Sequence, residues 1–278
     1  MAEITAQAVK ELRDLTNLPM MEVKRALTEA NGDQTRAIEI LKESNKKVSI
    51  KRAENATSEG LIRTGVSADG SCAAMVEIQC ESAPVAKADD FVFLADQCVK
   101  QLLTGPGATT ADELMVQAAP DRPGQTLAGL LEEVVGKIRE KMVVARVLLV
   151  KGPAGAYAHH DGKTGVLFCA SGENKTAAVL RDVAMHIAGL KPTVTHPEEL
   201  PAADVATERT RLTAEAATSG KPANILEKIV DGRMKTFFAE QGVLSYQMFA
   251  KDDSKTVNQA LAENGLKAAS FTRWVLGN

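Results

Sequence analysis

The sequence predicts an α+β protein, and three features of its apolar pattern support this prediction. Residues 1–50 show the three- and four-residue spacing of helices, interrupted by turn residues. Residues 61–142 and 143–278 each contain two strand-like runs followed by a helical one, which predicts two related subdomains with antiparallel sheets that helices cover on one face. Residues 197–241 lack a strand-like run, so we expect a helical hairpin inserted into the second subdomain.

The first 50 residues are expected to form a bundle of three short helices, similar in size and pattern to a ubiquitin-associated domain. Thr5 and Asp33 are placed to cap the first and third helices, since their side chains accept hydrogen bonds from free backbone amides. Pro19 suits the start of the second helix. The composition turns polar from Ser44 to Glu59, which favours a linker, and we place the linker at residues 51–60. The apolar residues that these helices carry include Val9, Leu12, Met20, Val23, Leu27, Ala37, Ile40 and Leu41.

The first subdomain is expected to contain two strands and two helices. The strands cover Leu61–Val66 and Cys72–Gln79. The second strand turns sharply into a helix over Ser82–Leu103, which Ser82 is placed to cap, and another helix is expected over Leu127–Lys141. One face of the helix after the turn is apolar and carries Val85, Ala88, Val92, Ala95, Val99 and Leu102.

The second subdomain repeats the order of strand, strand and helix. These elements are expected over Val143–Val150, Val166–Ala170 and Thr176–Leu190. The helical hairpin follows, and its Gly and Pro residues place the turn at Ser219-Gly220-Lys221-Pro222. The elements expected to complete the second sheet are strands over Leu244–Phe249 and Ser270–Val275 and a helix over Ser254–Glu263 with Ser254 as its cap.

Composition and charge argue against several classes of protein. The net charge is −3 with both signs interspersed, which argues against a nucleic-acid binder that relies on a basic face. No apolar run approaches the ~18 residues that span a bilayer, so we expect no membrane partner. The first residues lack the basic and then apolar pattern of a secretory signal, so we expect a cytoplasmic protein.

The cysteines and histidines indicate no catalytic or metal centre. Cys72, Cys80, Cys98 and Cys169 are scattered without a Cys-x-x-Cys pair, which indicates neither a zinc site nor a disulfide framework. The four histidines are not accompanied by a nucleophile elbow, a His-Glu-x-x-His motif or a phosphate-binding loop. We therefore expect a protein that is not an enzyme, has no catalytic residues and uses no cofactor.

Motifs along the whole chain resemble the bacterial elongation factor Ts family, the guanine nucleotide exchange factors of elongation factor Tu. The strand-to-helix turn of that family reads Cys-x-Thr/Ser-Asp-Phe-Val-Ala-Lys/Arg, and Cys80, Ser82 and Val85-Ala86-Lys87 fit it. Further matches follow in the family's order at Met20-Met21-x-x-Lys24-x-Ala26-Leu27, at Asp182–Pro192, at Ser219-Gly220-Lys221-Pro222 and at Gly232-Arg233-Met234-Lys235. One difference is local, because Ala83 and Pro84 occupy the positions of the family's Asp and Phe.

The resemblance implies a function and a set of site residues. The family's turn displaces the partner's Mg²⁺ and so weakens bound GDP, which assigns this role to Ser82, Ala83, Pro84 and Val85. A second family contribution comes from a histidine two residues after a tyrosine, which favours His159 over His160. The protein itself is then expected to bind elongation factor Tu and no nucleotide.

The remaining contacts to the partner are expected from the amino-terminal bundle. Leu12, Met20 and Met21 match the family there, and the pattern leaves open which methionine fills the core and which meets the partner. The apolar residues of the helical hairpin could serve partner contact or self-association, which would give a homodimer.

Two other functions stay open at the level of sequence. Loss of the Asp-Phe pair could make this chain a diverged paralogue that binds or chaperones elongation factor Tu with little exchange activity. Alternatively, residues 1–50 could be a peptide- or ubiquitin-binding module fused to an unrelated body, although the family match downstream argues against this.

Overall fold

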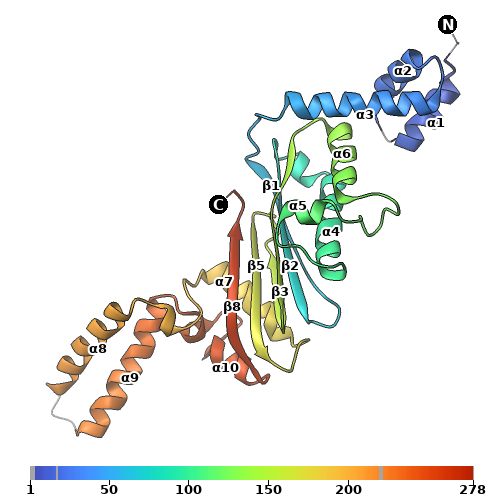
Figure 1. The fold of residues 1–278 in the computed structure, drawn as a ribbon. Helices are drawn as coiled ribbons and strands as arrows, with labels where there is room; N and C mark the ends of the chain where they lie inside the picture. The colour runs from blue at the N-terminus through green and yellow to red at the C-terminus, as the bar shows by residue number, and fades with distance from the viewer. Residues whose placement is uncertain (1–3, 17, 219–221, 278) are drawn as a thin grey trace. The chain divides into compact units, whose positions relative to one another are not determined.

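The computed structural model describes residues 4–16, 18–218 and 222–277 and confirms the α+β class (Figure 1). The chain divides into two compact units. The first consists of residues 1–63, 76–148 and 276–278, and the second of residues 64–75 and 149–275. Three long strands run from one unit into the other, so neither unit is a continuous stretch of sequence. The domain boundaries expected from the sequence stay a prediction.

The first unit begins with the predicted three-helix bundle. Its helices are α1 (Ala6–Thr16), α2 (Met20–Glu29) and α3 (Gln34–Lys51). The Thr5 hydroxyl accepts a hydrogen bond from Ala8 N and the Asp33 carboxylate accepts one from Arg36 N, which confirms both predicted caps. The core of the bundle contains Val9, Leu12, Leu18, Val23, Ala26, Leu27, Ala30, Ala37 and Leu41.

Two expectations about the bundle are wrong. Met20 is 52% exposed and lies outside the core. Helix α3 continues to Lys51, so the polar stretch from Ser44, which favoured a linker, is helical up to the first residue of the linker placed at 51–60. This extension is rich in Lys, a good helix former, and its two apolar residues, Val48 and Ile50, do not repeat at helical spacing, so the sequence pattern does not reveal it. Asn17, part of the expected turn between the first two helices, lies outside the described residues.

The first sheet has the strand order β1-β2-β3, with β1 at Glu59–Val66, β2 at Cys72–Cys80 and β3 at Met142–Lys151. We expected β3 to open the second sheet, and this is wrong because β3 pairs beside β2. The run Val143–Val150 predicts a strand but contains nothing that selects its neighbour. Strand β2 is buried along most of its length, including the charged Glu77, which lies among its apolar residues.

Helices α4 (Asp89–Thr104), α5 (Ala111–Met115) and α6 (Leu127–Ile138) complete the first unit (Figure 1). Helix α4 starts seven residues later than predicted, because a short 3-10 helix, η1 (Val85–Lys87), stands between it and β2. Ser82 is consequently not its cap. The buried face of α4 consists of Phe91, Leu94, Ala95, Gln97, Cys98, Val99 and Leu102.

The sheet of the second unit has the order β4-β5-β8 and is antiparallel. Its strands are β4 (Ala154–Ala158), β5 (Thr164–Gly172) and β8 (Leu266–Val275). Helix α7 (Ala178–Leu190) packs on β4 and β5. A side chain at Gly155 would place its Cβ 2.1 Å from the Leu180 carbonyl oxygen, so glycine permits this close contact between helix and strand.

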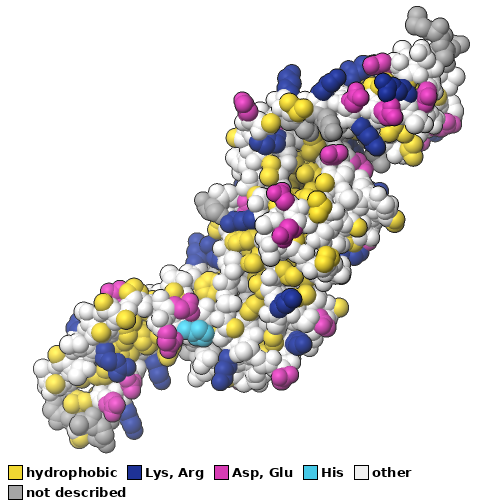
Figure 2. All heavy atoms as spheres, viewed as in Figure 1, with side chains coloured by type: hydrophobic (Ala, Val, Ile, Leu, Met, Phe, Trp, Pro, Cys, Tyr) yellow, Lys and Arg dark blue, Asp and Glu magenta, His cyan; other side chains and the backbone are white. Residues whose placement is uncertain are grey.

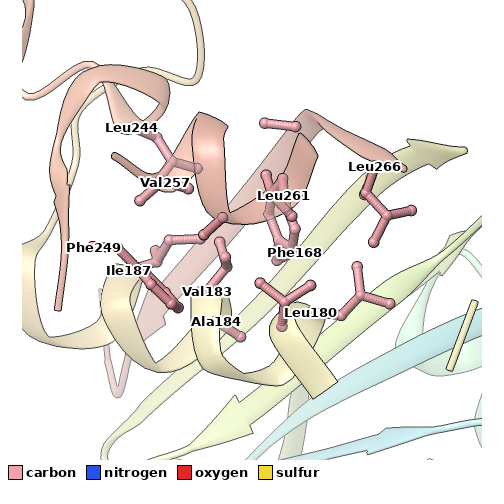
Figure 3. Packing of buried hydrophobic residues seen from close by; sticks show 14 of the residues in the cluster. Phe168, Leu180, Val183, Ala184, Ile187, Leu244, Phe249, Val257, Leu261 and Leu266 are labelled. Carbon is pink, nitrogen blue, oxygen red and sulfur yellow. The ribbon is translucent and has the colours of Figure 1, made fainter. Parts of the chain in front are cut away.

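The core of the second unit lies between this sheet and two helices (Figure 3). Phe168 of β5 is fully buried there. Around it lie side chains of α7, of α10 (Val257–Ala262) and of the segment before α10, including Leu180, Val183, Ile187, Leu244, Phe249, Val257 and Leu261. Burial of these apolar side chains is the main force that holds the helices on the sheet.

The helical hairpin is present as α8 (Ala202–Ala217) and α9 (Ala223–Glu240), preceded by η2 (Pro197–Glu199). In Figure 1 it extends away from the β4-β5-β8 sheet. The two helices bury Leu212, Ala216, Val230 and Met234 between them. Ser219, Gly220 and Lys221 of the predicted turn lie outside the described residues.

The segment after the hairpin differs from its predicted form. The expected strand over Leu244–Phe249 is the 3-10 helix η3 (Leu244–Tyr246) followed by β6 (Met248–Phe249), and β7 (Asp252–Thr256) pairs with β6. The expected helix begins only at Val257. Thr256 caps it through a reciprocal pair, in which Gln259 N donates to the Thr256 hydroxyl and Thr256 N donates to the Gln259 side chain. Ser254 lies inside β7.

His186 is a buried histidine that serves the fold. It is 1% exposed on α7. Its Nδ1 accepts a hydrogen bond of 3.1 Å from Ala250 N, which leaves the proton on Nε2, and Nε2 lies 2.9 Å from the Gln247 side-chain oxygen. Burial lowers the pKa of His186 from its ordinary value of 6.5, and the hydrogen bond to Gln247 opposes this shift. The neutral imidazole thus joins α7 to the segment around β6.

We expect the protein to become less stable as the pH falls below 6.5, the ordinary pKa of histidine. The unfolded state binds a proton at His186 more readily than the folded state, so acid favours unfolding, and the stability that the neutral imidazole provides is complete only above this pH. Urea unfolding at pH 7.5 and pH 5.5 measures the difference. The variant His186→Gln should show a smaller pH dependence, and an equal dependence in both proteins would contradict the assignment.

Candidate functional site

The turn between β2 and η1 presents two small side chains to solvent. Ala83 and Pro84 are exposed, and Val85 is half-buried. Pro84 has helical backbone angles, with φ −60° and ψ −38°, and its carbonyl accepts a hydrogen bond from Lys87 N. We call Ala83 and Pro84 the tip.

Ser82, directly before the tip, is held by hydrogen bonds through all of its polar groups. Its backbone N–H and its hydroxyl both donate to the carboxylate of Glu140, at 3.1 and 2.7 Å. Its carbonyl accepts from the Cys80 thiol at 3.3 Å and from Ala86 N at 3.4 Å. Hydrogen bonds to a carboxylate are stronger than neutral ones, so the base of the tip is well fixed.

Glu81, the residue before Ser82, is held by hydrogen bonds that its own carboxylate accepts. Its carboxylate accepts a 2.6 Å hydrogen bond from Lys141 N, two from the Arg52 guanidinium at 2.8 and 3.0 Å, and one from Asn55 at 2.8 Å. The hydrogen bond from Lys141 N holds the pKa of Glu81 below its usual range. Burial acts against this lowering of the pKa, and the hydrogen bonds from Asn55 and Arg52 add to it. The Lys141 ammonium in turn donates to the carbonyls of Ala53 and Asn55, at 2.6 and 2.9 Å. These bonds tie the segment after α3 to the base of the tip.

Sequence reasoning missed Glu140, Glu81 and Arg52. Glu140 lies 58 residues from Ser82, and Arg52 lies 29 residues from Glu81. Charged residues in polar segments occur throughout the chain, so no local signal distinguishes these three.

Cys80 supports the turn and is not a reactive thiol. It is fully buried. Burial raises its pKa to about 11, which keeps the thiol protonated at neutral pH and able to donate to Ser82. Burial also raises the pKa of Cys98 to about 12.

His159 lies in the second unit, where β4 turns into β5. Its backbone N–H donates to the Thr164 carbonyl at 2.8 Å, which closes the hairpin. Its ring Nδ1 lies 3.1 Å from the Tyr157 hydroxyl, so the tyrosine orients the imidazole. His159 is half-buried and His160 is exposed, with 4.2 Å between their ring centroids.

The three bundle residues expected to bind a partner differ in exposure. Leu12 is fully buried in the bundle core, so its side chain has no surface to offer. Met20 and Met21 are 52% and 73% exposed at the start of α2, and neither fills the core as one of them was expected to do. Leu15, which we did not single out, is 68% exposed on α1. Flexible methionines on a surface suit a protein contact.

The described residues offer neither a metal site nor a membrane span. There, no three His, Cys, Asp or Glu side chains come together in a way that could hold a metal ion. No helix within that part of the chain is long and apolar enough to span a membrane. Figure 2 shows basic and acidic side chains mixed over the face in view.

Comparisons with known proteins agree on one family. A family model described as Elongation factor TS matches residues 81–278. Proteins named Elongation factor Ts from Thiobacillus denitrificans and Paenarthrobacter aurescens are each 40% identical to the chain, over all of the chain and 93% and 100% of their own lengths. A protein of the same name from Bordetella petrii is 42% identical over all of the chain and 92% of its own length. The similarity thus includes the bundle, the tip and the β4–β5 hairpin.

Proposed function

The chain belongs to the elongation factor Ts family and is a guanine nucleotide exchange factor of translation elongation, and we propose that its tip, its bundle and the β4–β5 hairpin carry out the exchange on elongation factor Tu. Exchange breaks no covalent bond, so the protein is not a catalyst of a chemical reaction. The observation that carries the proposal is the tip, which is exposed at the family's turn and held by hydrogen bonds at its base.

The tip acts on the partner's Mg²⁺ and phosphate site. Mg²⁺ requires near-ideal octahedral geometry, so a small displacement of the loops around it is costly and weakens GDP. In this chain Ser82 fixes the backbone, Ala83 and Pro84 make the contact, and the half-buried Val85 supports them from beneath. In this proposal the chain itself binds no nucleotide, nucleic acid or membrane, and it works in the cytoplasm with its partner.

Affinity for the partner comes from the other two elements. Met20 and Met21 offer exposed apolar side chains on the bundle, while Leu12 acts only by holding the bundle together. His159 makes a second contact, with its ring oriented by Tyr157. Self-association through the hairpin has weaker support, because most of its large apolar side chains lie between α8 and α9, although Ile225 is 42% exposed.

We expect a stable complex between the full chain and nucleotide-free elongation factor Tu. Since factor and nucleotide bind antagonistically, linkage requires that GDP weaken the complex as much as the factor weakens GDP. Gel filtration after removal of nucleotide with a chelator should show co-elution, and excess GDP should separate the two proteins. Separate elution without nucleotide would refute the proposed partner. A complex that forms but does not speed GDP release would instead support a diverged paralogue that binds or chaperones elongation factor Tu.

A further inference from the structure

We propose that Glu140 is a positioning residue for nucleotide exchange, which sets the backbone of the tip through its two hydrogen bonds to Ser82. This inference rests on the proposed function. It adds a residue that lies 58 positions along the chain from Ser82, in a different segment from the turn that it positions.

Two pairs of neighbouring residues, Glu81-Ser82 and Glu140-Lys141, exchange hydrogen bonds with each other. The Glu140 side chain accepts from the backbone and hydroxyl of Ser82, at 3.1 and 2.7 Å. The Glu81 side chain accepts from the backbone of Lys141, at 2.6 Å. Each segment therefore fixes the other's backbone, and neither can shift along the other without losing charge-assisted hydrogen bonds.

The chain leading into Glu140 is itself constrained. Helix α6 ends at Ile138, and the next residue, Arg139, caps it in the left-handed conformation with φ 68° and donates its N–H to the Val135 carbonyl at 2.8 Å. This conformation closes the helix and directs the next two residues toward β3. The position of Glu140 is thus set by the end of helix α6, and its hydrogen bonds to Ser82 fix the position of Ser82 in turn.

The small size of the tip makes its backbone position decisive. Ala83 and Pro84 have no long side chain that could adjust to a displaced backbone. A shift at Ser82 would therefore pass directly to the contact with the partner. Misplacement of a contacting group by ~1 Å can cost ~100-fold in the rate of a step that depends on geometry.

The test compares Glu140→Ala with a control of the same chemistry in the same unit. Glu113 accepts two hydrogen bonds from one residue, from Thr109 N and from the Thr109 hydroxyl, both at 2.8 Å. Glu113→Ala thus removes an equivalent pair of bonds at the exposed start of α5. Melting temperatures of both variants report the loss of stability that a merely structural role predicts.

The functional readout is release of fluorescent GDP from elongation factor Tu at increasing concentrations of each variant. Glu140→Ala should lower the maximal rate by about tenfold, within the range for misplaced groups, and leave the half-saturating concentration within about threefold. Glu113→Ala should match the unaltered protein in both quantities. Ser82→Ala removes only the hydroxyl bond and should give an intermediate rate, whereas Ser82→Thr, which retains the hydroxyl, should restore it.

Several outcomes decide the matter. If Glu140→Ala is folded and as fast as the unaltered protein, or if Glu113→Ala is slowed equally, Glu140 has no positioning role. Should Glu140→Ala fail to fold, the contrast between Ser82→Ala and Ser82→Thr carries the same test, and equal rates for those two would overturn the proposal. If the unaltered protein itself does not speed GDP release, the proposed function is wrong. That result does not depend on the variants, so it can be told apart from a failure of the positioning role of Glu140.

Discussion

Replacing Ala83 by Asp and Pro84 by Phe is expected to accelerate GDP release from elongation factor Tu by ~10- to 150-fold over the unaltered factor. The family resemblance places Asp and Phe at these positions. Burying a phenylalanine is worth ~1.5–3 kcal/mol, and each ~1.4 kcal/mol is a factor of ten in an equilibrium constant. Stopped-flow measurement with fluorescent GDP gives the rate.

The structure explains why this turn can accept both side chains. Ala83 and Pro84 are exposed, so larger residues meet no core. Phenylalanine readily adopts the helical angles of Pro84, φ −60° and ψ −38°. The bonds that fix Ser82 involve neither replaced side chain and should remain.

A control tests whether the effect depends on the position of the phenylalanine or only on adding an exposed aromatic side chain. Val116 is 73% exposed at the end of α5, and Val116→Phe should leave the release rate unchanged. If the folded double variant is no faster than the unaltered factor, the tip does not reach the partner's nucleotide site, and exchange depends on His159 and its surroundings.

Phe168→Ala is expected to reduce the free energy of unfolding by ~3–5 kcal/mol, the usual cost of removing a buried aromatic side chain. Phe168 is fully buried among residues of α7, α10 and β8, so the space it leaves cannot fill without moving several elements (Figure 3). Urea unfolding measures the loss. Strand β5 also pairs with β4, which carries Tyr157, so this core supports the hairpin of His159.

Phe93→Ala is the matched control for this core. Phe93 is only half-buried, and its ring faces the Arg122 guanidinium at 5.2 Å. Its removal costs a cation–π contact, worth ~0.5–1 kcal/mol at exposed sites, and only part of the apolar burial that Phe168→Ala removes, so the total loss should be smaller. Equal losses for the two variants would mean that Phe168 is not central to the core.

Local chemistry was predictable from the sequence. Thr5 and Asp33 cap their helices as expected, because capping depends on one side chain and the next few backbone amides. Strand β4 was not predicted, since Ala154–Ala158 contains no β-branched residue. The close packing of α7 on Gly155 explains why such small residues are found in this strand.

Contacts between distant segments were not predictable. The strand Met142–Lys151 joins the first sheet, although its composition suits either sheet equally. The turn itself was identified from its motif, but the partner of Ser82 was not. Ser82 does not cap α4, because this helix begins only at Asp89. The Ser82 hydroxyl donates to Glu140 instead. Such long-range pairs depend on the fold as a whole and leave no spacing in the sequence.

The most direct test of the central claim is the rate of GDP release from elongation factor Tu with and without this protein. Elongation factor Tu loaded with fluorescent GDP is mixed with excess unlabelled GDP and increasing amounts of the unaltered factor in a stopped-flow instrument. We expect a release rate that rises with factor concentration and then saturates. A rate that stays at the value for elongation factor Tu alone, in a preparation that is folded and full-length, would contradict it.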